Sequence, residues 1–268
     1  MPAPAMTDRL ETVLRHDRIV TGVALALLAG AAWLYLAHMA MEMSDGDAGS
    51  MASMSMLAMQ MWDWREVVLL AGMWAIMMVA MMVPAATPMI LMFAAVHRRR
   101  AASGGPAVST TVFVLGYLVV WTAFSIMAAL VQAALHMAAV ISPAMAATSP
   151  LIAAGVLVAA GVFQWTPLKH ACLAACRSPL SFVMTRWREG RLGALAMGIH
   201  HGLYCLGCCW VLMALLFVAG VMNLAWVAIL AVTVLVERVV PRGELVARVI
   251  GLLLLVGGLG LAMPALVR

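Results

Sequence analysis

The chain has 268 residues, of which 66% are hydrophobic and only 10% are charged. A soluble domain cannot bury that much apolar surface, so the composition excludes an ordinary soluble protein and predicts a polytopic membrane protein. The formal net charge of +5 does not indicate nucleic acid as a partner, because the arginines lie in short polar segments, where positive charge sets the orientation of membrane helices.

The N-terminal third predicts a leader, one span and an acidic loop. Residues 1–18 are polar and contain three arginines, so we expect a cytoplasmic leader. Residues 19–37 form an apolar run of spanning length. Residues 38–63 contain acidic residues and neither Lys nor Arg, which predicts a loop on the outer, periplasmic side.

This predicted loop is rich in methionine, and two interpretations of it stay open. The loop could fold onto the bundle, with its methionines facing lipid or helices, since Met packs adaptably. Alternatively, it is a thioether-rich arm that captures Cu(I), because thioethers are soft ligands. The residues concerned are His38, Met39, Met41, Met43, Met51, Met54, Met56, Met59 and Met61.

The second predicted span, residues 67–96, carries a row of methionines at helical spacing. Such a row more often packs a core, but its place beside the Met-rich loop makes a relay for Cu(I) almost as good an interpretation. The candidate ligands are Met73, Met77, Met81 and Met82. Pro84 and Pro88 should kink the helix and free backbone carbonyls that a neighbour or a ligand must satisfy. The following run of His97 and three arginines marks the cytoplasmic side.

Two further spans, 108–136 and 151–165, precede a basic segment, 168–191, which predicts a cytoplasmic loop. This loop contains Cys172 and Cys176, whose i, i+4 spacing would place both thiols on one face of a helix. They are candidate ligands of a shared metal, and a reduced structural pair is the alternative.

Residues 193–221 form an uncharged segment long enough to span a bilayer, yet its middle holds His and Cys. On a helix, His201, Cys205 and Cys208 fall within an arc of roughly 60°, and Cys209 lies about 40° further round. Imidazole and sulfur ligands select Cu(I), with zinc or an iron–sulfur centre as alternatives. The plainer interpretation is that these residues pack, but polar groups inside a membrane are usually functional.

Spans 224–236 and 245–266 complete the chain, and Glu237 between them is expected to form a surface ion pair with Arg238 or Arg242. The count predicts an all-α bundle of about seven transmembrane helices in one domain, 19–266, with a cytoplasmic N-terminus and a periplasmic C-terminus. Without nucleotide-binding motifs, ATP-driven pumping by this chain alone is disfavoured.

Three blocks, MWAIMMVAMMVPAATPM at 73–89, TPLKHACLAACRSPLSF at 166–182 and GALAMGIHHGLYCLGCCWVLMALLFVAGVMNLAW at 193–226, resemble a family of bacterial integral membrane proteins predicted to bind metal. The resemblance implies location in the bacterial inner membrane. It supports metal binding by Cys172, Cys176, His201, Cys205, Cys208 and Cys209, and implies nothing about the Met-rich loop, which lies outside the blocks.

The favoured hypothesis is a Cu(I)-binding membrane protein that transports or delivers copper by ligand exchange, from methionines outside to Cys and His ligands within. Its expected partners are membrane lipid, the metal ion and a copper chaperone or cuproprotein. Two alternatives stay open: a membrane enzyme that relays thiol–disulfide exchange between Cys205/Cys208 and Cys172/Cys176, and a structural or assembly subunit in which Cys and Met only pack. An enzyme is the less favoured class.

Overall fold

The computed structural model describes residues 4–45, 64–104, 110–138 and 149–267, and within them every regular element is a helix. This agrees with the predicted all-α class. The helices are α1 (Pro4–Asp45), α3 (Trp64–Ala102), α4 (Thr110–Met137), α5 (Pro150–Phe163), α6 (Pro167–Arg177), α7 (Pro179–Arg186), α8 (Gly190–Ala214), α9 (Leu216–Ala219), α10 (Leu224–Val239) and α11 (Gly243–Val267).

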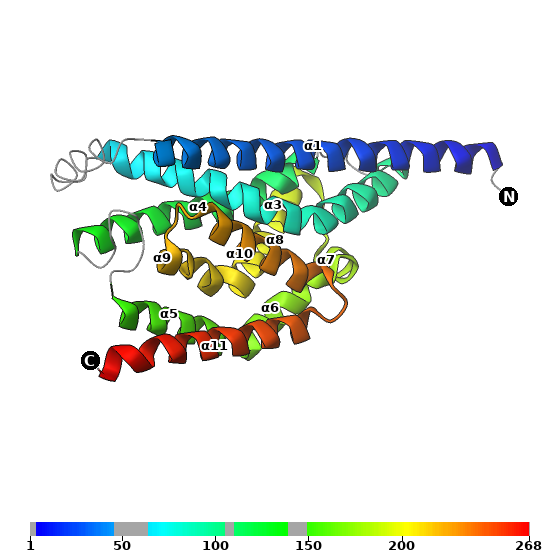
Figure 1. Ribbon diagram of the computed structural model, residues 1–268. Coiled ribbons are helices and arrows are strands. Elements are labelled where there is room, and N and C mark those ends of the chain that lie inside the picture. Colours follow the sequence, from blue (N-terminus) through cyan, green and yellow to red (C-terminus); the bar gives the residue numbers. More distant parts are fainter. Residues whose placement is uncertain (1–3, 46–63, 105–109, 139–148, 268) are drawn as a thin grey trace.

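Several of these helices are long and apolar enough to cross a membrane. By length and composition, five described helices qualify, and α5 with α6, which meet at an angle of 63°, would make a sixth. The helix α10 has 16 residues and so spans roughly 24 Å, less than the ~30 Å of a bilayer core. The count of seven spans therefore stays a prediction, as does the orientation. The first residues of α1 and the last of α11 do lie at opposite ends of the molecule (Figure 1).

Three predicted segment boundaries differ from the structure. The helix α1 covers 4–45, so it includes most of the predicted leader and the first residues of the predicted loop 38–63. The remaining loop methionines, from Met51 to Met61, lie outside the described residues. The predicted loop 168–191 is mostly helical, because Pro167 and a bond from the Lys169 backbone N–H to the Thr166 side chain start α6 there.

The helices pack as neighbours in a layered bundle (Figure 1). The most extensive contacts join α4 with α8, α5 with α11, α3 with α4 and α1 with α3, while α6 lies against α8, and α10 contacts α3 and α11. The helix α8 therefore has neighbours that come from both halves of the chain.

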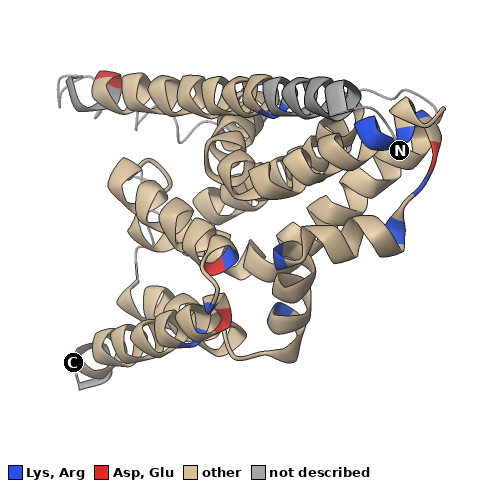
Figure 2. Cartoon of the chain, turned by 90° about the vertical axis from the view of Figure 1, so that its right-hand side faces the viewer, with Lys and Arg blue, Asp and Glu red and all other residues tan. Residues whose placement is uncertain are grey.

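Large apolar side chains cover much of the outer surface. On α11, Leu253 and Val256 are more than half exposed, and on α4 the same is true of Leu115 and Val119. Figure 2 shows that Lys, Arg, Asp and Glu occupy few positions, so that the described helices run for many turns without one. Contiguous apolar exposure of this kind suits contact with lipid.

Two glycines hold α4 and α8 in backbone contact. A Cβ added to Gly198 would lie 2.0 Å from the Phe113 carbonyl oxygen, and one added to Gly116 would lie 2.3 Å from the Leu195 oxygen. Only small residues let membrane helices approach this closely. The contact places Tyr117 of α4 against the His201 ring of α8.

The helix α3 continues through both of its prolines, and the carbonyl that Pro84 releases has a partner on another helix. Pro84 has no N–H to donate to the carbonyl four residues earlier, that of Ala80. The indole N–H of Trp33 donates to this carbonyl at 3.1 Å. A side chain of α1 thus satisfies the backbone group that the proline releases, which ties α1 to α3.

Candidate metal centre

The helices α6 and α8 bring all five cysteines of the chain into one region. Cys205, Cys208 and Cys209 are fully buried on α8, and Cys176 on α6 is nearly so. Cys172 lies over Gly207, since a Cβ added there would be 2.8 Å from the Cys172 sulfur. All five are free thiols. The predicted helical face of Cys172 and Cys176 is therefore present, and it is turned toward α8.

Four of these thiols, Cys176, Cys205, Cys208 and Cys209, form what we call the thiol cluster. The Cys208 and Cys209 thiols both donate to the carbonyl oxygen of Cys205, at 3.1 and 3.0 Å. The Cys208 sulfur also lies within interacting range of the Cys176 and Cys209 sulfurs. The cluster thus joins two helices whose cysteines are about thirty residues apart in sequence.

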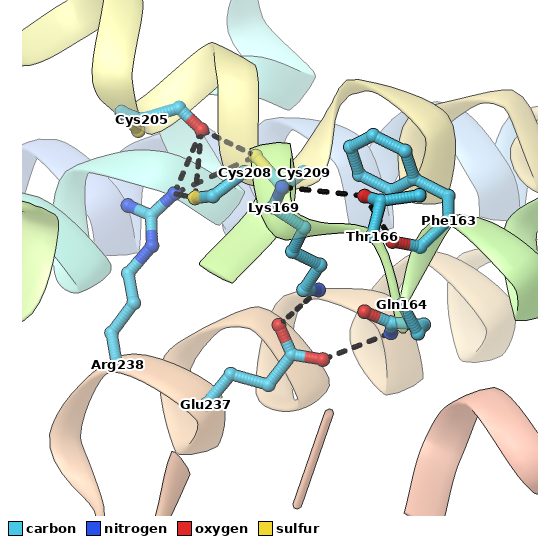
Figure 3. A network of polar contacts seen from close by, with 9 residues as sticks. All are labelled: Phe163, Gln164, Thr166, Lys169, Cys205, Cys208, Cys209, Glu237 and Arg238. Atoms are coloured by element: carbon cyan, nitrogen blue, oxygen red, sulfur yellow. Dashed lines mark hydrogen bonds and ion pairs between the residues drawn. The ribbon is translucent and has the colours of Figure 1, made fainter. Parts of the chain in front are cut away.

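Arg238 of α10 reaches into the thiol cluster, as Figure 3 shows. Its Nη2 donates to the Cys205 carbonyl oxygen at 3.2 Å, to the Cys208 sulfur at 3.3 Å and to the Cys209 sulfur at 3.5 Å. Its buried Nε and Nη1 have no hydrogen-bond partner among the described residues. A cation therefore lies where sulfur ligands would become negative on losing their protons.

The expected surface ion pair of Glu237 with Arg238 or Arg242 is wrong. Glu237 is buried and pairs with Lys169 of α6, at 2.7 Å between Nζ and Oε2, and Gln164 Nε2 donates to its other oxygen at 3.0 Å. Lys169 is fully buried rather than part of a solvated basic loop. Burial of either charge alone would be costly, so the two charges pair inside the bundle (Figure 3).

His201 lies in an aromatic enclosure beside the cluster. Its ring stacks on Phe113 and Tyr117, with centroids 6.1 and 5.5 Å away, and meets the edge of Phe182 at 5.8 Å. Within the described residues neither ring nitrogen has a hydrogen-bond partner, although the side chain is buried. His200 instead contacts the Ala196 carbonyl of its own helix through Nδ1 at 2.9 Å. His201 is thus the better candidate ligand.

Tyr117 links α3 to the cysteines. Its hydroxyl donates to the Met82 carbonyl oxygen at 3.1 Å and lies 3.0 Å from the Cys205 sulfur. The predicted relay methionines, Met73, Met77, Met81 and Met82, are all buried in the core. Burial suits both packing and ion relay, so their role as ligands stays a prediction.

The predicted cysteine and histidine ligands are neighbours rather than a closed cage. Among the described residues, no three or more His, Cys, Asp or Glu side chains are grouped to enclose one metal ion. A four-ligand zinc site would need such a group.

Sequence reasoning missed Arg238, Tyr117 and the Lys169–Glu237 pair as parts of this region. A signal for the charged residues was present, because Glu237 and Arg238 directly end an apolar run in which ionisable groups are expensive. No local pattern marked Tyr117, whose contact with Cys205 joins residues 88 positions apart.

The comparisons with known proteins place the sequence in a family. No curated protein and no solved structure matches the chain. A family model described as a copper chaperone, PpoB2, matches residues 71–261, which is well over half of the chain and contains every predicted cysteine and histidine ligand. This agrees with the metal-related family that the sequence blocks resemble. The chain belongs to the PpoB2 family of copper chaperones.

Proposed function

We propose that the protein binds Cu(I) as cargo in the thiol cluster and passes it on, in copper transport or delivery across or at a membrane. The observation that carries this proposal is that buried thiols from α6 and α8 meet at Cys208, and that the Arg238 guanidinium donates to the Cys208 and Cys209 sulfurs. Membership of a copper chaperone family supports copper as the ion.

The chemistry of the cluster favours Cu(I). Thiolate sulfur is a soft ligand, and a Cu(I) ion held by two thiolates carries a net negative charge. Burying that charge is unfavourable without a counter-charge, and Arg238 supplies one at hydrogen-bonding distance from two of the sulfurs. Binding would release the thiol protons and leave the copper oxidation state unchanged.

The proposed path runs from thioether to thiolate ligands. The methionine row of α3 reaches the cluster at Met82, whose carbonyl shares the Tyr117 hydroxyl with Cys205. Thiolates are charged and bind Cu(I) more tightly than neutral thioethers, so ligand exchange would move the ion toward the cysteines. His201 would assist there, and Cys176, which belongs to the cluster, and Cys172 beside it would receive or release the ion toward the cytoplasm.

The setting we propose is the bacterial inner membrane, with seven spans, a cytoplasmic N-terminus and a periplasmic C-terminus. The apolar exterior and the long apolar helices support a membrane location. A cuproprotein or a second copper chaperone would be the partner. Thiol–disulfide exchange between Cys208 and Cys176 stays an alternative, because the two sulfurs lie close together, but it gives the methionine row no role.

Replacing both Cys205 and Cys208 with serine should remove the tightly bound copper. Serine keeps the size but not the soft sulfur, so we expect a loss of about one Cu(I) per chain. The measurement is elemental analysis of protein purified under reducing conditions with Cu(I). His200→Gln is the matched control, because His200 contacts its own helix and should leave copper content unchanged. Unchanged copper in the double variant would refute the proposal.

Arg238→Met should weaken Cu(I) binding without abolishing it. The guanidinium touches the ligand sulfurs but is not itself a ligand, and loss of such groups costs about 10 to 100-fold in metal affinity. Arg238→Lys keeps the charge and should recover part of the affinity. Competition with a colorimetric Cu(I) chelator measures the change, and Arg242→Met, on an exposed arginine, is the control. Equal affinity in the Arg238→Met and Arg242→Met proteins would exclude this role.

A further inference from the structure

A small pocket lies near the end of α1, the start of α3 and the turn that precedes α10, far along α3 from the thiol cluster. Four methionines from these three elements line it: Met39 on α1, Met73 and Met77 on α3, and Met222 in the turn. The other lining residues are all apolar, namely Leu36, Ala40, Val221, Leu224 and Val227. Residues that are distant in sequence thus bring four methionine side chains to one pocket.

The size and lining of this pocket restrict what it can hold. Its free space is about 10 Å³, the room of one water-sized sphere. Water is a poor occupant, because the lining gives it no strong hydrogen-bond partner. A divalent or hard cation would find no carboxylate, imidazole or thiolate among the lining residues to offset its charge. A soft monovalent ion is the occupant that neutral thioethers suit.

We propose that Met39, Met73, Met77 and Met222 form a thioether site that takes up Cu(I) before the ion reaches the thiol cluster. The identity of the ion rests on the proposed function, whereas the site itself rests on the pocket. It differs from the predicted capture by a flexible loop, since Met39 belongs to the helix α1 and Met73 and Met77 share one face of α3.

The burial of the four methionines fits a route inward. Met39 and Met222 are half-buried, while Met73 and Met77 are only 5% and 1% exposed. An ion would meet the outer pair first and the inner pair next. From Met73 to Met82, whose carbonyl adjoins the thiol cluster through Tyr117, α3 rises roughly 14 Å. The pocket and the cluster are therefore separate sites joined by one methionine row.

The double variant Met73→Leu/Met77→Leu tests the site on the full-length protein. Leucine conserves the volume, so the packing stays while two sulfurs are lost. Met78→Leu/Met89→Leu is the matched control, because both residues are equally buried on α3 but do not line the pocket. In Cu(I) titrations we expect the test variant to lose about one weakly held ion, with the control like the wild type.

Methionine oxidation gives a second, residue-specific readout in the wild type. A thioether that donates to a metal ion is a weaker nucleophile toward peroxide, so Ag(I), a redox-stable probe for soft sites, should slow sulfoxide formation at Met39 and Met222. Met184, exposed on α7, should oxidise at the same rate with and without Ag(I). Mass spectrometry of the peptides follows each residue.

The outcomes separate this inference from the proposed function. Loss of the weak ion in the test variant, with the Cys205/Cys208-dependent ion retained, supports a separate thioether site. Equal titrations for the test and control variants, or no protection of Met39 and Met222, overturn the site and leave copper binding by the cysteines standing. If the Cys205→Ser/Cys208→Ser protein loses its tightly bound copper while Ag(I) still protects Met39, the result supports both the thioether site and copper binding by the cysteines.

Discussion

Replacing Lys169 with methionine should lower the stability of the protein by about 3–5 kcal/mol, because it leaves the Glu237 carboxylate buried without its cation. Lys169 is fully buried, Glu237 is 2% exposed, and 2.7 Å separates Nζ from Oε2. Gln164 alone would then face the charge. Thermal unfolding in mild detergent, followed by tryptophan fluorescence, should show a Tm lower by roughly 10 °C.

Two variants make this prediction specific. Lys169→Met/Glu237→Gln removes both charges and should recover most of the stability, since a buried pair costs little to replace as a whole. Arg100→Met breaks an exposed pair with Glu189, whose side chains are 46% and 57% exposed, and should change stability by less than about 1 kcal/mol. A Lys169→Met protein as stable as the Arg100→Met protein would contradict the buried pair.

The same variant should also weaken Cu(I) binding. Glu237 and Arg238 are consecutive on α10, so the pair with Lys169 holds the end of α10 where Arg238 meets the thiol cluster. A reduction in affinity that persists in Lys169→Met/Glu237→Gln would tie the charge pair to the position of the guanidinium, whereas full recovery there would assign the loss to the unpaired Glu237 carboxylate. The ion pair thus connects the folding of α6 against α10 with the site.

Gly198→Ala should have the second large effect, a loss of at least about 2 kcal/mol, because the new methyl group has no room. Its Cβ would lie 2.0 Å from the Phe113 carbonyl oxygen and 3.1 Å from the Gly116 Cα, both parts of a helix backbone that cannot rotate away. The helices α4 and α8 would have to separate. Tyr117 would then move from Cys205, so a lower Tm should come with weaker Cu(I) binding.

Gly155→Ala is the matched control, because nothing lies within 4 Å of a Cβ at this helical position. Alanine has the higher helix propensity, so this control should be neutral or stabilised by about 0.5–1 kcal/mol. If Gly198→Ala unfolds at the same temperature as Gly155→Ala, the close approach of α4 and α8 is absent in the folded protein.

The sequence by itself determined the features that depend on composition and local period. The apolar runs fixed the all-helical class and the long apolar helices, and the i, i+4 spacing placed Cys172 and Cys176 on one face of α6. Pro84 predicted a backbone carbonyl without its helical hydrogen bond, and the Trp33 indole N–H donates to that carbonyl, which belongs to Ala80. These features were predictable because helix geometry relates residues a few positions apart, and the sulfur-rich composition indicated copper.

Only the tertiary structure decided which groups meet across helices. It brought the Cys176 thiol close to the Cys208 thiol and placed the Arg238 guanidinium against the sulfurs. It also paired Glu237 with Lys169, which lies 68 positions away in the sequence. It also gathered Met39 and Met222 beside Met73 and Met77. No sequence period encodes such contacts, because they depend on how closely the glycines let helices pack and on which buried charge is within reach of another.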